Sequence, residues 1–327
     1  VSVVDEAVMP GSPISPRIPM NVAVAFALGL MGAFGLVFLL EYMDQTVKDP
    51  AEVQRMLEVP VIGMVPQSSS KETLITLSNP RSPASEAFRT LRTNIQYSRV
   101  DSPVKKILVT GGNPDSGKST VSANLAVTLA QSGKPVLLVD TDLRRPVQHK
   151  LFDFSSEPGL SSLIFNENIS LSQALRKTEH GNLTVLPCGP IPPYPAEMIA
   201  SARMKSLVDQ LSGTFEYIIF DSPPTTVVTD ATILSKLVDG TLLVFDYGRA
   251  RKDDAVAVAE QLRMVQAHII GAVINMVPQG NSYYSGYYNY YYYGRSGAVK
   301  ARRKDKRRSD QGRRFDNSER RDAGGGN

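Results

Sequence analysis

The sequence predicts an α/β fold in which helices sandwich a parallel sheet, with one transmembrane helix before it and a disordered tail after it. Three observations predict this. Short aliphatic segments alternate with segments of helical spacing between residues 80 and 280, which is typical of a parallel sheet covered on both faces. An uncharged stretch precedes them, and a tyrosine-rich, then basic stretch follows. With 327 residues, 42% of them hydrophobic, the chain can bury a sizeable core.

Cysteine content and charge restrict the possible sites. The single cysteine, Cys188, excludes an intrachain disulfide and any metal or iron–sulfur site that needs several thiolates. The formal net charge is +4, but residues 295–327 contain 12 basic and 5 acidic residues, a net charge of +7. The rest of the chain therefore carries −3, so a mildly acidic globular part precedes a strongly basic tail.

The first 40 residues are expected to form an extended arm and one membrane-spanning helix. The arm, residues 1–20, has a proline at every third residue from Pro10 to Pro19, which favours a polyproline-like conformation. Residues 22–40 carry no charge and, as a helix, would span about 28 Å, close to the hydrocarbon core of a bilayer. We therefore assign residues 21–40 to a transmembrane helix. A cleaved signal peptide is disfavoured because no small-residue cleavage pattern follows.

Residues 41–79 are expected to link this helix to the main domain. Asp49 and Pro50 have the pattern of an N-cap and first helical position for a short helix ending at Leu57, and residues 60–65 have the pattern of a strand. The main domain, residues 80–280, contains six further predicted strands and two clear helices. The strands are 107–110, 136–139, 183–186, 217–220, 241–245 and 269–274, and the helices are 119–131 and 253–265.

A phosphate-binding motif follows the first strand of this domain. It matches G-x-x-x-x-G-K-[ST] between a predicted strand and a predicted helix, the context that makes the motif specific. Such a loop points backbone N–H groups and a helix N-terminus at phosphate oxygens, while Lys118 reaches the β and γ phosphates and Ser119 ligates magnesium. The predicted nucleotide-binding residues are Gly112, Asn113, Pro114, Asp115, Ser116, Gly117, Lys118, Ser119 and Thr120.

A magnesium–nucleotide site also needs a carboxylate at the end of a neighbouring strand. Asp221 ends one apolar strand, and Asp140 ends another, with Asp142 two residues further on. An acid at a strand end is often only a turn or cap residue. Beside a phosphate loop in the same parallel sheet, however, the two acidic strand ends indicate metal binding and activation of a nucleophile. The sequence therefore predicts a P-loop NTPase fold.

These segments resemble the three nucleotide motifs of the bacterial tyrosine kinases, which belong to the polysaccharide co-polymerase system for capsule and exopolysaccharide. The matching segments are residues 112–120, 138–144 and 218–224. Glu86, Arg89 and Arg92 match the family's E-x-x-R-x-x-R oligomerisation motif, although alone they would more often be a solvated helix face. The C-terminal tyrosine cluster matches the autophosphorylation tail, so the resemblance covers residues 10–293.

The resemblance implies an ATP-dependent protein-tyrosine kinase with four catalytic residues. Lys118 and Ser119 would hold MgATP, Asp221 and Asp142 would belong to the magnesium site, and Asp140 would orient or deprotonate the attacking hydroxyl. The γ-phosphoryl group would pass to tyrosines 281–294 of an adjacent protomer. The acceptors are Tyr283, Tyr284, Tyr287, Tyr288, Tyr290, Tyr291, Tyr292 and Tyr293.

Asp115 departs from the family's phosphate loop, which commonly has Gly at this position. Asp tolerates a positive φ better than most residues, so the turn can form. Its charge would lie close to the phosphates, which leaves the nucleotide affinity open.

The resemblance also implies partners and a location. The partners are a homo-oligomeric ring, an octamer in the family, the polysaccharide polymerisation and export machinery, and a cognate tyrosine phosphatase. The basic tail, residues 295–327, is expected to face the anionic membrane surface and to bind no specific nucleic acid. The chain would cross the bacterial inner membrane once, with its kinase domain in the cytoplasm because ATP is there. It would be the C-terminal part of a longer co-polymerase or the product of a split system.

Two other functions stay open on the sequence alone. A partition or septum-positioning ATPase of the same broad fold would use ATP to switch dimerisation, but it would carry a signature Lys where this chain has Asn113. The second alternative function is a membrane-anchored scaffold with a degenerate nucleotide site. Its tyrosine block lacks the interleaved arginines expected of a nucleic-acid stacking groove.

Overall fold

The computed structural model of the protein describes residues 11, 15–68, 73–99 and 102–278, which fall into two compact units divided after Gln45. The first unit contains helix α1 (Ile18–Met43), whose side chains are all exposed. At about 1.5 Å per residue its 26 residues measure about 39 Å, and α1 is long and apolar enough to cross a membrane. Most of the proline arm lies outside the described residues.

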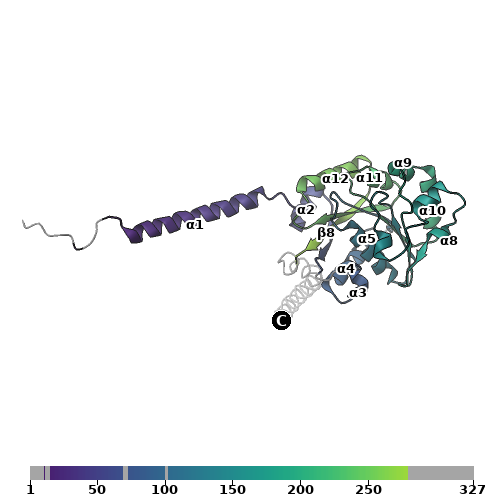
Figure 1. Ribbon diagram of the computed structural model, residues 1–327, viewed down its shortest axis with the longest axis horizontal. Coiled ribbons are helices and arrows are strands. Elements are labelled where there is room, and N and C mark those ends of the chain that lie inside the picture. The colour runs from purple at the N-terminus through teal and green to yellow at the C-terminus, as the bar shows by residue number, and fades with distance from the viewer. Residues whose placement is uncertain (1–10, 12–14, 69–72, 100–101, 279–327) are drawn as a thin grey trace, which may run out of the picture. The chain divides into compact units, whose positions relative to one another are not determined.

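The second unit is built on a central sheet with helices around it (Figure 1). The sheet has eight strands in the order β1-β8-β7-β2-β6-β3-β5-β4. The strands are β1 (Val61–Pro66), β2 (Lys106–Thr110), β3 (Val136–Asp140), β4 (Arg176–Lys177), β5 (Leu183–Leu186), β6 (Tyr217–Asp221), β7 (Gly240–Asp246) and β8 (Ile269–Val277). All neighbouring strands are parallel except β4 and β5. The six strands predicted for the main domain are confirmed, whereas the two-residue edge strand β4 was not predicted.

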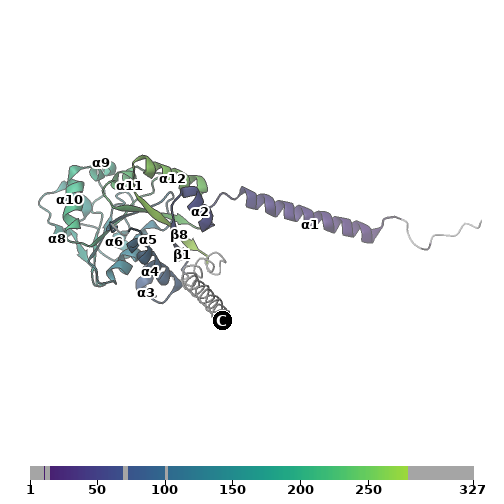
Figure 2. The same ribbon diagram turned by 180° about the vertical axis from the view of Figure 1, so that it is seen from behind.

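Helices cover both faces of this sheet, as predicted (Figure 2). They are α2 (Pro50–Leu57), α3 (Ile75–Ser78), α4 (Pro83–Gln96), α5 (Lys118–Ala130), α6 (Gln148–Leu151), α7 (Leu160–Phe165), α8 (Leu171–Ala174), α9 (Pro195–Ile199), α10 (Ala202–Ser212), α11 (Asp230–Leu234) and α12 (Lys252–Met264). Strand side chains point alternately to the two faces. Leu242 and Val244 of β7 therefore pack with α4 and α5, whereas Leu243 and Phe245 pack with α2 and α12.

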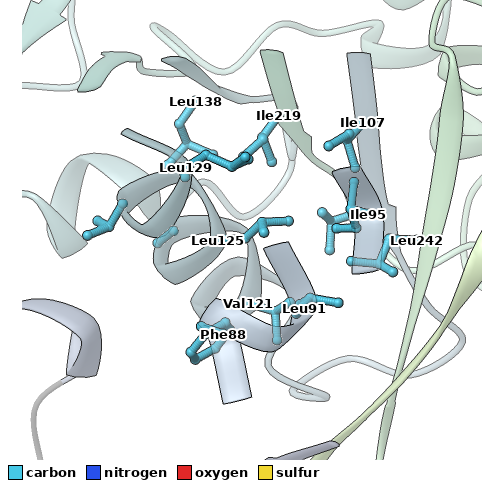
Figure 3. Close-up of a cluster of buried hydrophobic side chains, with 14 of the residues drawn as sticks. Phe88, Leu91, Ile95, Ile107, Val121, Leu125, Leu129, Leu138, Ile219 and Leu242 are labelled. Carbon is cyan, nitrogen blue, oxygen red and sulfur yellow. The ribbon is translucent and has the colours of Figure 1, made fainter. Parts of the chain in front are cut away.

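The core between α4, α5 and the sheet holds the phosphate loop's helix in place. Phe88 and Leu91 of α4 and Leu125 and Leu129 of α5 are buried against aliphatic strand residues (Figure 3). Each such side chain contributes about 1.5–3 kcal/mol when buried. Eleven of the 13 residues of α5 are buried, so the helix is packed on nearly all sides beneath the loop that precedes it.

Residues 46–66 belong to the second unit, although their sequence suggested a linker up to residue 79. Asp49 caps α2 as predicted, accepting a hydrogen bond from the Ala51 N–H at 2.9 Å. Strand β1 pairs in parallel with β8, and all six of its residues are buried. The two strands are about 200 residues apart in the chain, so local sequence patterns do not reveal their pairing. The tyrosine cluster and the basic tail lie outside the described residues, and their disorder stays a prediction.

Candidate active site

The phosphate loop connects the end of β2, in the middle of the sheet, to the first residue of α5. Gly117 adopts a φ of +81° and Asp115 a φ of +59°. Both values lie in the left-handed region, which glycine adopts freely and Asp tolerates better than most other residues. The departure of Asp115 from the family pattern is therefore compatible with the turn.

Lys118 lies inside this loop. Its Nζ donates to the Asn113 carbonyl oxygen at 2.8 Å, and the Ser116 hydroxyl donates to the same oxygen at 3.1 Å. Burial lowers the pKa of Lys118, while the nearby carboxylates of Asp221 and Asp142 act to raise it. The loop therefore holds one largely buried cation close to the acidic strand ends.

Asn275, near the end of β8, supports the loop from the side. Its Nδ2 donates to the Ser116 carbonyl oxygen at 3.0 Å. A Cβ atom at Gly117 would lie 2.2 Å from this nitrogen, so a larger residue there would displace the Asn275 amide from this hydrogen bond. The sequence analysis missed Asn275, whose one signal is an amide within an otherwise apolar strand.

Asp140 and Asp221 lie side by side beneath the loop. They are register partners on β3 and β6, and both are fully buried. Asp140 Oδ2 accepts hydrogen bonds from the backbone N–H groups of Val147 at 3.0 Å and Gln148 at 2.9 Å. Its Oδ1 has no partner among the described residues. Burial raises the pKa of Asp140 well above its ordinary range, and the neighbouring Asp221 charge raises it further.

Asp221 is held by side chains instead of backbone groups. The Ser122 hydroxyl donates to its Oδ1 at 3.1 Å and the Gln148 side-chain amide donates to its Oδ2 at 2.7 Å. Burial raises the pKa of Asp221 to about 6, although hydrogen bonds from Gln148 and Ser119 act to lower it. Gln148 was also missed by the sequence analysis, since a single Gln at the start of a four-residue helix carries no recognisable signal.

Asp142 lies at the pocket wall with its carboxylate turned to its own loop. Its Oδ1 accepts from the backbone N–H groups of Arg144 at 3.2 Å and Arg145 at 2.9 Å. The Arg144 side chain makes two hydrogen bonds to Asp230, at 3.0 and 3.2 Å. Asp230 is buried, so this ion pair ties the loop after β3 to the start of α11.

A pocket of about 560 Å³ opens beside these groups. The predicted site residues that line it are Pro114, Asp115, Gly117, Lys118, Ser119, Thr120 and Asp142. Asp140 and Asp221 lie behind this wall. Among the described residues no group of three or more His, Cys, Asp or Glu side chains could enclose a metal ion. A magnesium ion fits such a site only if phosphate and water oxygens complete its coordination, which is how Mg²⁺ usually binds.

The three residues of the oligomerisation motif lie on α4. Arg89 pairs with Glu86 and donates to the Pro80 carbonyl oxygen at 2.8 Å. Arg92 donates to the Thr128 carbonyl oxygen at 3.1 Å and so links α4 to α5. All three make contacts within the chain, and their role between subunits stays a prediction. The predicted tyrosine acceptors lie outside the described residues.

A phosphate loop between β2 and α5, with acids ending the neighbouring parallel strands, defines the class of the domain. It is a P-loop NTPase, and residues 103–306 match the ParA family, described as "NUBPL iron-transfer P-loop NTPase".

Similar proteins identify the family within the P-loop NTPases to which the chain belongs. The chain is 39% identical over 221 residues to the tyrosine-protein kinase YwqD of Bacillus subtilis, covering 68% of this chain and 93% of that protein. It is 30% identical over 299 residues to the tyrosine-protein kinase Etk of Escherichia coli K12, covering 85% of this chain but 41% of that protein. The solved Etk kinase domain is similar with a TM-score of 0.67 and 30% identity, over 72% of this chain and 97% of that domain. The chain belongs to the bacterial tyrosine kinases and is a protein-tyrosine kinase.

Proposed function

We propose that this chain transfers the γ-phosphoryl group of MgATP to the C-terminal tyrosine cluster of a neighbouring subunit, and that it thereby regulates capsule or exopolysaccharide polymerisation and export. The observation that carries the proposal is the buried pair Asp140 and Asp221 directly beneath a phosphate loop that contains Lys118. Phosphoryl transfer depends chiefly on positioning and charge stabilisation. This arrangement can provide both.

The phosphate loop, residues 112–120, would hold the nucleotide phosphates. Lys118 would leave the Asn113 carbonyl and move to the β and γ phosphates, while Ser119, Asp142 and Asp221 would belong to the magnesium site. A magnesium ion held by these residues would supply positive charge against the charge that develops on the phosphates. Asp221 suits this role because hydrogen bonds already hold both of its oxygens in one orientation.

Asp140 would orient or deprotonate the tyrosine hydroxyl. Its Oδ1 has no hydrogen-bond partner within the described part of the chain and is available to accept one. Burial raises the pKa of Asp140 in the nucleotide-free chain, which favours uptake of a proton there. A base of this kind typically contributes a factor of about 10²–10⁴ to the rate.

Transfer between subunits would change the charge of the tail. Each phosphotyrosine adds about −1.5 to −2, so roughly four would cancel the tail's +7 and eight would make it negative. This reversal would weaken contact with anionic lipid and promote dissociation of the ring that Glu86, Arg89 and Arg92 help to form. A cognate phosphatase would restore the ring. The kinase domain would lie in the cytoplasm, anchored by α1 in the inner membrane.

The test is incubation of the full chain, purified in detergent, with labelled ATP and Mg²⁺. Label on tyrosines 283–293 is expected, with a large loss in the Lys118→Met variant. A variant with all eight acceptor tyrosines changed to Phe should lose the label but still bind nucleotide. Release of free phosphate without labelled tyrosine would contradict the proposal, and so would normal cycling between ring and monomer in the Phe variant.

A further inference from the structure

Gln148, the first residue of α6, contacts three residues of the proposed site. Its side chain is fully buried. Its Nε2 donates to Asp221 Oδ2 at 2.7 Å and to the Ser119 carbonyl oxygen at 3.1 Å. Its backbone N–H donates to Asp140 Oδ2 at 2.9 Å. One residue therefore connects the phosphate-loop serine with both buried acids.

The chemistry of this contact is specific for an amide. A Gln NH₂ group has two hydrogens to donate and no charge, so it can hold a carboxylate and a carbonyl at once without neutralising the acid. Ser122 holds the other oxygen of Asp221 at 3.1 Å. Neutral donors, including Gln148 and Ser122, therefore orient the Asp221 carboxylate, and its negative charge stays available to a cation.

Two oxygens beside this contact lack partners. Asp140 Oδ1 and Gln148 Oε1 are both buried, and neither accepts a hydrogen bond from any described residue. A buried acceptor left unpaired destabilises the protein, and most buried acceptors have a partner. Such oxygens are expected where a hydrated cation or a substrate hydroxyl supplies the missing donors.

We propose that Gln148 is a positioning residue of the magnesium site: its amide fixes Asp221 and the Ser119 backbone relative to each other, and its free oxygen accepts a hydrogen bond from metal-bound water. This inference rests on the proposed kinase function, which requires Mg²⁺ at Ser119 and Asp221. Partners behind metal ligands typically affect metal affinity by about 10- to 100-fold.

The test measures ADP binding to the full chain in detergent by calorimetry, over a range of Mg²⁺ concentrations and in EDTA. Gln148→Met keeps the length and volume of the side chain but removes the amide. It should raise the Mg²⁺ concentration needed for half-maximal enhancement of ADP binding by about tenfold or more. ADP affinity in EDTA should stay within about twofold of wild type, because the phosphate loop itself is intact. A merely structural role would weaken ADP binding equally with and without Mg²⁺.

Gln96→Met is the matched control. Gln96 is a half-buried glutamine on α4 that lies 3.5 Å from the Tyr217 hydroxyl, at the start of β6, whereas Asp221 ends that strand. The Gln96→Met variant should need the same Mg²⁺ concentration as wild type for half-maximal enhancement of ADP binding. If Gln148→Met does not fold, the same measurement on Gln148→Asn tests the proposal. That variant keeps the amide but is one methylene too short to reach both partners, and it should also raise the requirement.

Measurements on the wild-type chain distinguish a wrong metal site from a wrong role for Gln148. If Mg²⁺ does not enhance ADP binding to wild type, the proposed metal site is wrong and the inference is wrong with it. If wild type depends on Mg²⁺ and the folded Gln148 variant has the same requirement, only the role of Gln148 is overturned.

Discussion

Asp140 and Asp221 occupy opposite positions at the last residues of two neighbouring parallel strands, where both are fully buried. Two carboxylates so placed repel each other when both are ionised, and burial disfavours each charge further. The protein compensates with backbone donors on Asp140 and side-chain donors on Asp221. These donors hold two carboxylates close together, and a pair of close carboxylates suits a site that binds a cation.

Replacing Asp140 with Asn should separate catalysis from binding. The amide cannot accept the proton of a tyrosine hydroxyl, so the rate of tyrosine phosphorylation should fall about 10²-fold or more. MgADP affinity should change by less than about threefold, since Asp140 is not among the proposed metal ligands. Phosphopeptide mapping beside calorimetry measures both quantities. An Asp140→Asn variant with more than half of the wild-type rate would exclude this residue as the base.

The stability of the nucleotide-free chain should fall as the pH rises from about 4 to about 6. In the folded state the pKa of Asp221 is raised from 3.8 to about 6, so the folded protein binds this proton more tightly than the unfolded chain does. The contribution of this carboxyl to the free energy of unfolding is therefore fully present below pH 4 and lost above pH 6. It amounts to on the order of 3 kcal/mol. Urea unfolding of wild type in detergent measures the slope.

Asp221→Asn should reduce this pH dependence. Asp140 also contributes through its raised pKa, so part of the slope should remain. Asp209→Asn, at an exposed position of α10, is the control and should leave the slope unchanged. An Asp221→Asn profile that matches wild type would mean that the carboxyl does not titrate as the structure implies.

Gly117→Ala should disrupt the phosphate loop through contact as well as backbone strain. The added Cβ would lie 2.2 Å from Asn275 Nδ2, and φ is +81°. ADP affinity should fall at least tenfold. Gly133→Ala is the matched control, because Gly133 has a φ of +85° but open space around it. Its effect should be limited to about 1 kcal/mol of stability with normal ADP binding, and equal nucleotide affinities in the two variants would contradict this account.

Arg144→Ala should destabilise the protein by leaving the Asp230 carboxylate buried without its ion partner. Asp230 is 1% exposed, and a buried acceptor that loses its donor costs about 1–3 kcal/mol. Adding Asp230→Asn should recover part of this loss, because it removes the uncompensated charge. Arg203→Ala, which breaks an exposed pair with Glu167, should cost less than about 1 kcal/mol. Chemical denaturation of wild type, Arg144→Ala, Asp230→Asn and the double variant tests the coupling, and additive losses would rule it out.

The sequence by itself determined the features that depend on neighbouring residues. The glycines, Lys118 and Ser119 of the phosphate loop lie within a few positions of one another, and Asp140 and Asp221 each end an apolar segment that is visible as a strand. The uncharged run that forms α1 is equally local. Periodicity and short motifs record such features because one backbone conformation sets them.

Only the tertiary structure decided which distant segments meet. It placed β1 beside β8, brought Asn275 against Gly117, and set Gln148 between Ser119 and Asp221. Arg144 and Asp230, 86 positions apart, pair for the same reason. Each contact joins residues whose separation in the chain has no fixed relation to their distance in space, because parallel strands pair only through long crossover connections. The phosphate loop and the acidic strand ends were therefore predictable from sequence, whereas the distant residues that contact them were not.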